Sequence, residues 1–201
     1  MRRNRLESLP WLPYVAPMVV FLALTDIEGR VPLALYPYLY GLKVLLVSLA
    51  LWVFRGVWRE IQWETRVLPL AVAVEIMVFA GWIWLDKWIP YPHLGARTGL
   101  NPFTAIENSI GRAIFLGARF YGLVLMVPLM EELFWRSFLL RYLTIPEFKT
   151  LPLGAFSWTA FALVAGAFGL AHSEWLVAIL TAISYGLLLR DAKFVGLHRR
   201  A

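Results

Sequence analysis

Apolar runs of about twenty residues recur along this chain, and they limit its fold more than any other feature. A helix needs about that many mostly apolar residues to cross the hydrocarbon core of a bilayer. The runs that meet this requirement, the first and last of them barely, are 9–25, 31–54, 67–85, 110–143, 153–173 and 174–190. The sequence therefore predicts an all-α, polytopic transmembrane helical bundle with about six spans.

Composition supports the same fold class. Hydrophobic residues make up 60% of the chain and charged residues 16%, against roughly 25% charged in a soluble domain. With no cysteine in the sequence, a disulfide framework, a thiolate zinc site and a cysteine nucleophile are all excluded. The net charge of +6 comes from basic residues between the apolar runs, without a contiguous patch. We therefore expect the lipid bilayer as a partner and no nucleic acid.

The basic residues also predict an orientation, because cytoplasmic loops of membrane proteins hold most of the lysine and arginine. With the N-terminus inside, the outer segments hold only Arg30, Lys87 and Arg97. The inner segments hold Arg2, Arg3, Arg5, Arg55, Arg59, Arg66, Arg141, Lys149, Arg190, Lys193, Arg199 and Arg200. This asymmetry predicts that both termini are cytoplasmic.

The organisation along the chain has three parts. Residues 1–109 hold N-terminal transmembrane helices and one substantial loop, residues 110–190 hold a core, and residues 191–201 form a short basic tail. The run 110–143 is too long for one straight crossing at 1.5 Å per residue. We expect a break at Pro128, which cannot donate a backbone hydrogen bond to the carbonyl of Val124.

Glu131, Glu132 and Arg136 lie inside that apolar run. Charged side chains in hydrocarbon cost several kcal/mol and are functional candidates by default. On a helix, Glu132 and Arg136 are four residues apart and face the same side, so they are expected to pair and to support the site. Glu131 points about 100° away, which makes it the candidate reactive group, able to take and give a proton. The alternative is a purely structural ion pair.

A second pattern, Phe168-Gly-Leu-Ala-His172, ends the fifth run. Phe168 and His172 are four residues apart, so their rings are expected to pack together. Gly166 and Gly169 would allow close helix approach. If Ser157 caps this helix, the rise per residue puts His172 at about the depth of Glu131. We therefore predict that Glu131, Glu132, Arg136 and His172 converge in one intramembrane cavity, although a lone histidine at a helix end can also be a satisfied interfacial residue.

Other charged residues are weaker candidates. Lys43 and Arg119 are expected either to snorkel toward the interface or to pair with Glu75, which lies mid-span. The ten tryptophans are expected to serve mostly in packing and in the interfacial belt.

The run Glu131-Glu132-Leu-Phe-Trp-Arg136 followed by Phe168-Gly-Leu-Ala-His172 resembles the Glu-Glu-x-x-x-Arg and Phe-x-x-x-His motifs of the CPBP intramembrane proteases. These include the type II CAAX prenyl endopeptidases and bacterial Abi-type, bacteriocin-immunity-like proteins. The continuation His-Ser-Glu-Trp at 172–175 looks most like bacterial CAAX prenyl protease-related proteins found with exosortase systems. The resemblance covers roughly residues 110–190. It implies an integral protein of the bacterial inner membrane.

The resemblance also implies a site and a reaction. Glu131 and His172 take the positions that activate a water for peptide hydrolysis, and Glu132, Arg136 and Phe168 take supporting positions. The implied substrate is a membrane-associated protein or peptide, and a prenylated one does not follow from the family name. A zinc ion held by Glu131 and His172, with Glu132 as a further donor, and a metal-free water activated by Glu131 both stay open.

One motif of the family is missing. A third motif, His-x-x-x-Asn or similar, lies on a later transmembrane helix in the family, but only eleven residues follow Arg190 here. We therefore expect a chain that is truncated relative to the family, with impaired hydrolysis. The alternative function is a non-catalytic membrane scaffold or a bacteriocin-immunity-type protein.

Overall fold

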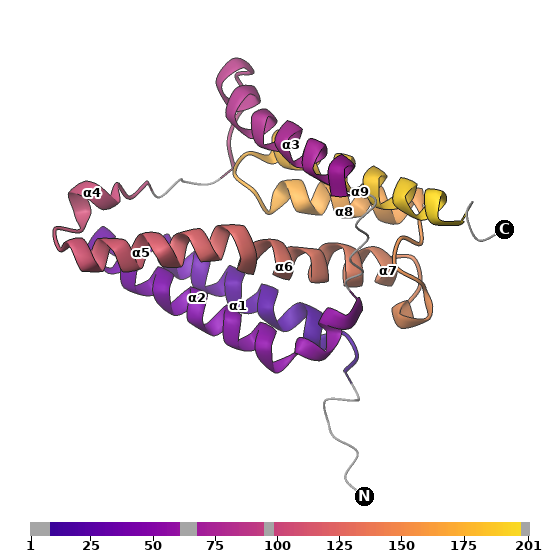
Figure 1. Ribbon diagram of the computed structural model, residues 1–201, viewed down its shortest axis with the longest axis horizontal. Helices are drawn as coiled ribbons and strands as arrows, with labels where there is room; N and C mark the ends of the chain where they lie inside the picture. The colour runs from indigo at the N-terminus through magenta and orange to yellow at the C-terminus, as the bar shows by residue number, and fades with distance from the viewer. Residues whose placement is uncertain (1–8, 61–67, 95–98, 198–201) are drawn as a thin grey trace, which may run out of the picture. The chain divides into compact units, whose positions relative to one another are not determined.

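The computed structural model describes residues 9–60, 68–94 and 99–197, and within these ranges the chain is helical with no strand. This confirms the predicted all-α class. The chain divides into two compact units that interleave along the sequence. The first unit is Met1–Glu60 with Thr98–Phe134, and the second unit is Ile61–Arg97 with Trp135–Ala201. Figure 1 shows the helices of both units.

Two helices are long and apolar enough to cross a membrane, Leu33–Val53 and Ser109–Tyr142. Shorter apolar helices span Val72–Leu85, Trp158–Leu170 and Trp175–Leu187. The helix nearest the N-terminus, α1, runs from Leu12 to Glu28. The predicted apolar runs therefore coincide with helices, while the count of about six spans stays a prediction.

A helical hairpin opens the first unit. α1 (Leu12–Glu28) and α2 (Tyr36–Val53) lie side by side (Figure 1), joined by a connection that contains the 3₁₀ turn Leu33–Leu35. Pro13 lies in the first turn of α1, where its missing N–H has no partner to lose.

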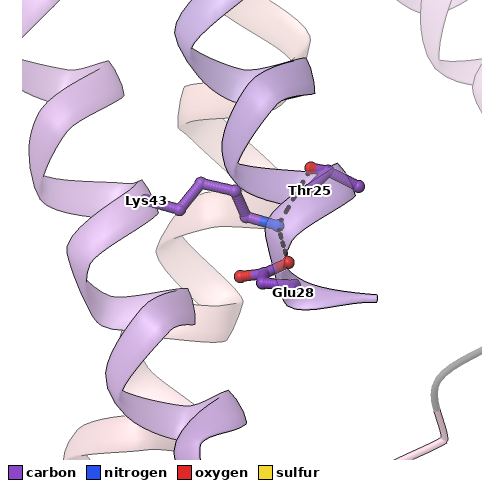
Figure 2. Close-up of polar contacts among 3 residues, drawn as sticks. All are labelled: Thr25, Glu28 and Lys43. Atoms are coloured by element: carbon purple, nitrogen blue, oxygen red, sulfur yellow. Dashed lines mark hydrogen bonds and ion pairs between the residues drawn. The ribbon is translucent and has the colours of Figure 1, made fainter. Parts of the chain in front are cut away.

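The hairpin contains a buried ion pair between Lys43 of α2 and Glu28 of α1, each only 5% exposed. The Lys43 ammonium also donates to the hydroxyl of Thr25 at 3.3 Å, as Figure 2 shows. The rings of Phe21 and Tyr40 lie about the same ammonium, with centroids 5.0 and 4.9 Å from Nζ. The expectation that Lys43 snorkels or pairs with Glu75 is therefore wrong. Lys43 pairs with Glu28 instead, and pairing offsets part of the cost of burying the two charges.

The first unit also contains α4 (Pro102–Ala105), α5 (Ser109–Tyr121) and α6 (Val127–Glu131). Asn108 caps α5 by accepting from the N–H groups of Ile110 and Gly111. The ring of Phe115 on α5 packs against the rings of Tyr36 and Tyr40 on α2.

The helix Ser109–Tyr142 is continuous, so the expectation of a break at Pro128 is wrong. Its hydrogen bonds change register instead. Residues Gly122–Met126 form a π-helical turn, and the N–H of Val127 donates to the carbonyl of Gly122, five residues back. Glu132–Leu139 form a second π-helical segment. Widened turns of this kind adapt the helix to the donor that proline lacks, and they often occur at functional sites.

The second unit is built on α3 (Leu68–Trp88), α8 (Trp158–Leu170) and α9 (Trp175–Leu197), with the short α7 (Leu140–Tyr142). α8 and α9 form a hairpin, and α3 packs on α9. Ser157 caps α8 by accepting from the N–H of Ala160, which confirms the predicted cap.

Glycine allows the close approach of α8 and α9. A Cβ at Gly169 would lie 2.4 Å from Cγ1 of Ile179, and a Cβ at Gly186 would lie 2.2 Å from Cε2 of Phe161. Gly166, also expected to allow close approach, has nothing within 4 Å of its would-be Cβ. The packing role therefore belongs to Gly169 and to Gly186.

Arg141 was expected among the cations of the inner surface, but it is buried, with 4% of its surface exposed. Its guanidinium donates to the carbonyl and the hydroxyl of Ser137 and to the carbonyl of Leu151, and it lies over the ring of Phe148. The Leu151 carbonyl lies in the connection after α7, outside any helix, and Arg141 supplies its donor. Arg141 therefore holds the connection after α7 in place, and its predicted location on the cytoplasmic side stays a prediction.

Candidate active site

His172 lies in the turn between α8 and α9, and the end of α8 fixes its orientation. Its backbone N–H donates to the carbonyl of Gly169 at 3.0 Å. Its ring Nδ1 lies 2.8 Å from the carbonyl oxygen of Phe168. The Phe168 and His172 rings pack with centroids 4.4 Å apart and planes tilted by 33°. The predicted pairing of Phe168 with His172 is confirmed, and the main chain of Phe168 contributes as much as its ring.

This geometry selects a tautomer for the imidazole. A carbonyl oxygen can only accept a hydrogen bond, so Nδ1 must carry the proton and donate it to Phe168. In the neutral ring the lone pair then belongs to Nε2. A ring nitrogen bonded to a backbone carbonyl is the usual anchor of a histidine that accepts a proton, orients a water or binds a metal.

Trp82 of α3 is a further neighbour of His172. The two rings meet edge to face, with centroids 5.8 Å apart. The indole N–H of Trp82 donates to Thr181 on α9 at 3.2 Å, and Thr181 donates in turn to the carbonyl of Val177. Sequence reasoning missed this residue, because nothing in the spacing along the chain relates position 82 to position 172.

The loop after α3 is fastened to the turn that follows His172. The N–H of Leu94 donates to the carbonyl of Ser173 at 2.9 Å. The indole N–H of Trp175 donates to the carbonyl of Pro92 at 2.8 Å, and the Trp175 ring packs edge to face on Tyr91. The turn that holds His172 is therefore restrained from both sides, by α8 and by this loop.

The acidic residues of the first motif lie on the helix Ser109–Tyr142. Glu131 is the last residue of α6, and Glu132 begins the second π-helical segment. Both belong to the first unit, whereas Arg136, Phe168 and His172 belong to the second. The convergence of Glu131 with His172 and the pairing of Glu132 with Arg136 therefore stay predictions.

Arg136 contacts Tyr185 within the second unit. Its guanidinium carbon lies 4.7 Å from the centroid of the Tyr185 ring. The Tyr185 hydroxyl donates to a carboxylate oxygen of Glu75 on α3. Glu75 thus has a partner that sequence reasoning did not identify.

Glu131, Glu132 and His172 are the side chains that the sequence offers as metal ligands. A catalytic zinc ion takes three protein ligands. Across the parts of the chain that the structure describes, no group of three or more histidine and carboxylate side chains is gathered to hold a metal ion. The donor set of Glu131, Glu132 and His172 therefore stays a prediction.

Comparison with known proteins identifies the region that holds both motifs. Residues 113–192 match the family model described as type II CAAX prenyl endopeptidase Rce1-like. No curated protein and no solved structure gave a significant match. The matched stretch contains Glu131, Glu132, Arg136, Phe168 and His172. Together with the apolar helices, this match over residues 113–192 indicates an integral membrane protein that is similar in that stretch to the CAAX protease family.

Proposed function

We propose that this protein is an intramembrane endopeptidase that hydrolyses a peptide bond of a membrane-associated substrate. The observation that carries the proposal is the CAAX-protease match over 113–192, which contains His172 in an anchored and oriented form. A group that orients the attacking water must itself be held in place, and the contact of Nδ1 with the Phe168 carbonyl holds the His172 ring.

In the proposed mechanism Glu131 acts as the general base. Its carboxylate takes a proton from a water molecule while that water attacks the scissile carbonyl carbon, and the C–N bond then breaks with a proton delivered to the leaving amine. His172 orients the water through Nε2. Glu132 and Arg136 support the position of Glu131, and an apolar setting strengthens each of these interactions.

The proposal is tested with the full chain in proteoliposomes. Single-span synthetic peptides, prenylated and unprenylated, are added, and new peptide termini are detected by mass spectrometry. We expect Glu131→Gln to lower kcat/KM by at least about 10²-fold, the usual contribution of a general base. Glu147→Gln, at an exposed position in a loop, is the matched control and should cleave as the wild type does. Repeating the assay with a chelator distinguishes a metal-activated water from one activated by Glu131 alone.

Two outcomes would contradict the proposal. Cleavage that persists in Glu131→Gln would remove Glu131 from the reaction. Equal and negligible cleavage by the wild type and the variant, across all peptides, would instead favour a non-catalytic membrane scaffold.

A further inference from the structure

Three polar side chains from three elements form one chain of contacts in the second unit. Arg136, on the second π-helical segment, lies with its guanidinium carbon 4.7 Å from the ring centroid of Tyr185 on α9. The hydroxyl of Tyr185 donates to the carboxylate of Glu75 on α3. The order of charge along the chain of contacts is therefore cation, aromatic ring, anion.

The two contacts strengthen each other. A guanidinium is attracted to the negative face of an aromatic ring. When the phenol hydroxyl donates to a carboxylate, electron density moves into the ring, and its face becomes more negative toward the cation. Glu75 thereby acts on Arg136 through Tyr185.

All three residues of this chain of contacts lie in apolar helices. Glu75 lies in the apolar helix Val72–Leu85, Tyr185 in Trp175–Leu187 and Arg136 in Ser109–Tyr142. A charge in such a segment is costly unless another group compensates for it. Glu75 and Arg136 carry opposite charges, and Tyr185 lies between them as the group that both contact.

We propose that Glu75 and Tyr185 are positioning residues for Arg136: Tyr185 holds the guanidinium on its ring face, and Glu75 fixes the ring by accepting its hydroxyl. The consequence for activity rests on the proposed hydrolytic function, in which Arg136 supports Glu131. Glu75 lies outside the stretch that matches the CAAX protease family, residues 113–192. The matched domain would thus depend on α3, a helix that the family match does not include.

The competing explanation is that the Glu75–Tyr185 bond only packs α3 on α9. A second hydrogen bond between the same helices, from Trp82 to Thr181, allows the two to be separated. Thr181→Val removes that bond, while the contact of Arg136 with Tyr185 and the bond of Tyr185 with Glu75 do not involve Thr181. If packing alone matters, Thr181→Val and Glu75→Leu should behave alike toward Arg136.

The first measurement does not depend on activity. Unfolding of the full chain is titrated with SDS in mixed micelles for Arg136→Gln, Tyr185→Leu and the double variant. We expect the effects on the unfolding equilibrium constant to be non-additive by about 2- to 30-fold, the range of a cation–π contact. Arg136→Gln combined with Thr181→Val should be additive. Additivity in both pairs, or equal coupling in both, would overturn the proposal.

The second measurement is peptide cleavage in proteoliposomes. We expect Tyr185→Phe, which keeps the ring, and Glu75→Gln, which keeps an acceptor oxygen, to retain more of kcat than Tyr185→Leu and Glu75→Leu. KM should change little, since positioning acts on the reaction rather than on binding. Ser184→Ala, which removes a neighbouring hydroxyl on α9 bonded to Leu180, is the matched control and should cleave like the wild type.

The two measurements distinguish two kinds of failure. Coupling between Arg136 and Tyr185 in a protein that cleaves no peptide would uphold the contact chain and refute the hydrolysis. Cleavage that is equal in Tyr185→Phe, Tyr185→Leu and the wild type would overturn the positioning role and leave the hydrolysis standing.

Discussion

Charged side chains inside the apolar segments of this protein are stabilised in two ways. Lys43 is neutralised directly by Glu28, in a pair that is buried on both sides. Arg136 lies on an aromatic ring whose hydroxyl reaches Glu75. In the first arrangement two buried charges of opposite sign neutralise each other by direct contact. In the second arrangement the planar guanidinium of Arg136 stacks on the face of the Tyr185 ring.

Breaking the direct pair should destabilise the first unit. We expect Lys43→Met to lower the free energy of unfolding by roughly 3–5 kcal/mol, because it leaves the Glu28 carboxylate buried without its cation. The double variant Lys43→Met with Glu28→Gln should regain most of that loss. Asp26→Asn, in the exposed pair with Arg30, is the control and should have no measurable effect. SDS titration measures all four proteins, and a double variant as unstable as Lys43→Met would contradict the account.

The tautomer of His172 can be observed directly. The chain has three histidines, so ¹⁵N labelling of histidine alone gives a short list of ring signals. We expect neutral His172 to carry its proton on Nδ1, because the Phe168 carbonyl accepts it at 2.8 Å. Comparison with His172→Gln assigns the signal. A proton on Nε2 in the neutral ring would contradict the orientation described for this side chain.

At the scale of helices, close packing of α8 on α9 holds the turn that carries His172. We expect Gly169→Ala to lower the free energy of unfolding by about 1–3 kcal/mol, because the new Cβ would overlap Ile179. Gly166→Ala, three residues away on the same helix with open space around it, should be neutral or slightly stabilising, since alanine favours a helix over glycine. Thermal unfolding in detergent measures both. Equal effects at the two positions would contradict the close contact.

The helices were largely predictable and their hydrogen-bond register was not. Apolar length gave the approximate bounds of Leu33–Val53 and Ser109–Tyr142, and Ser157 gave the start of α8, because hydropathy and capping are local properties. The π-helical turns were not predicted. A widened turn of about five residues is too short to change the periodicity of apolar residues in a recognisable way.

In the candidate site too, local contacts were predictable from the sequence and long-range contacts were not. The pairing of Phe168 with His172 follows from a spacing of four on one helix. The contacts of Trp82 with His172 and of Glu75 with Tyr185 join positions far apart in the sequence. No local pattern encodes such contacts, so they require the fold.

At the scale of the whole molecule, each of the two units consists of two stretches of chain, and these stretches alternate along the sequence. The first unit is completed by Thr98–Phe134, which follows α3 of the second unit in the sequence. The helix Ser109–Tyr142 contributes residues to both units. Glu131 and Glu132 of the first motif therefore lie in the first unit, and His172 of the second motif lies in the second unit.

The membrane orientation can be tested on the cysteine-free background of this chain. We expect Gly56→Cys and Glu147→Cys to react with an impermeant maleimide from the cytoplasmic side, because basic residues cluster in their segments. Arg30→Cys and His93→Cys should react from the opposite side. All four positions are exposed in the structure. Labelling of all four from the same side would contradict the predicted topology.

The π-helical turn Gly122–Met126 determines where the helix Ser109–Tyr142 can lose a single residue. Such a turn holds one residue more than an α-helix uses for the same stretch. Loss of one residue there, such as Leu123, would restore α-helical bonding and leave Glu131 on its original side. Loss of one residue from α5 would instead rotate everything after it by about 100°. We therefore expect single-codon deletions to be tolerated at 122–126 and to be damaging one or two turns earlier.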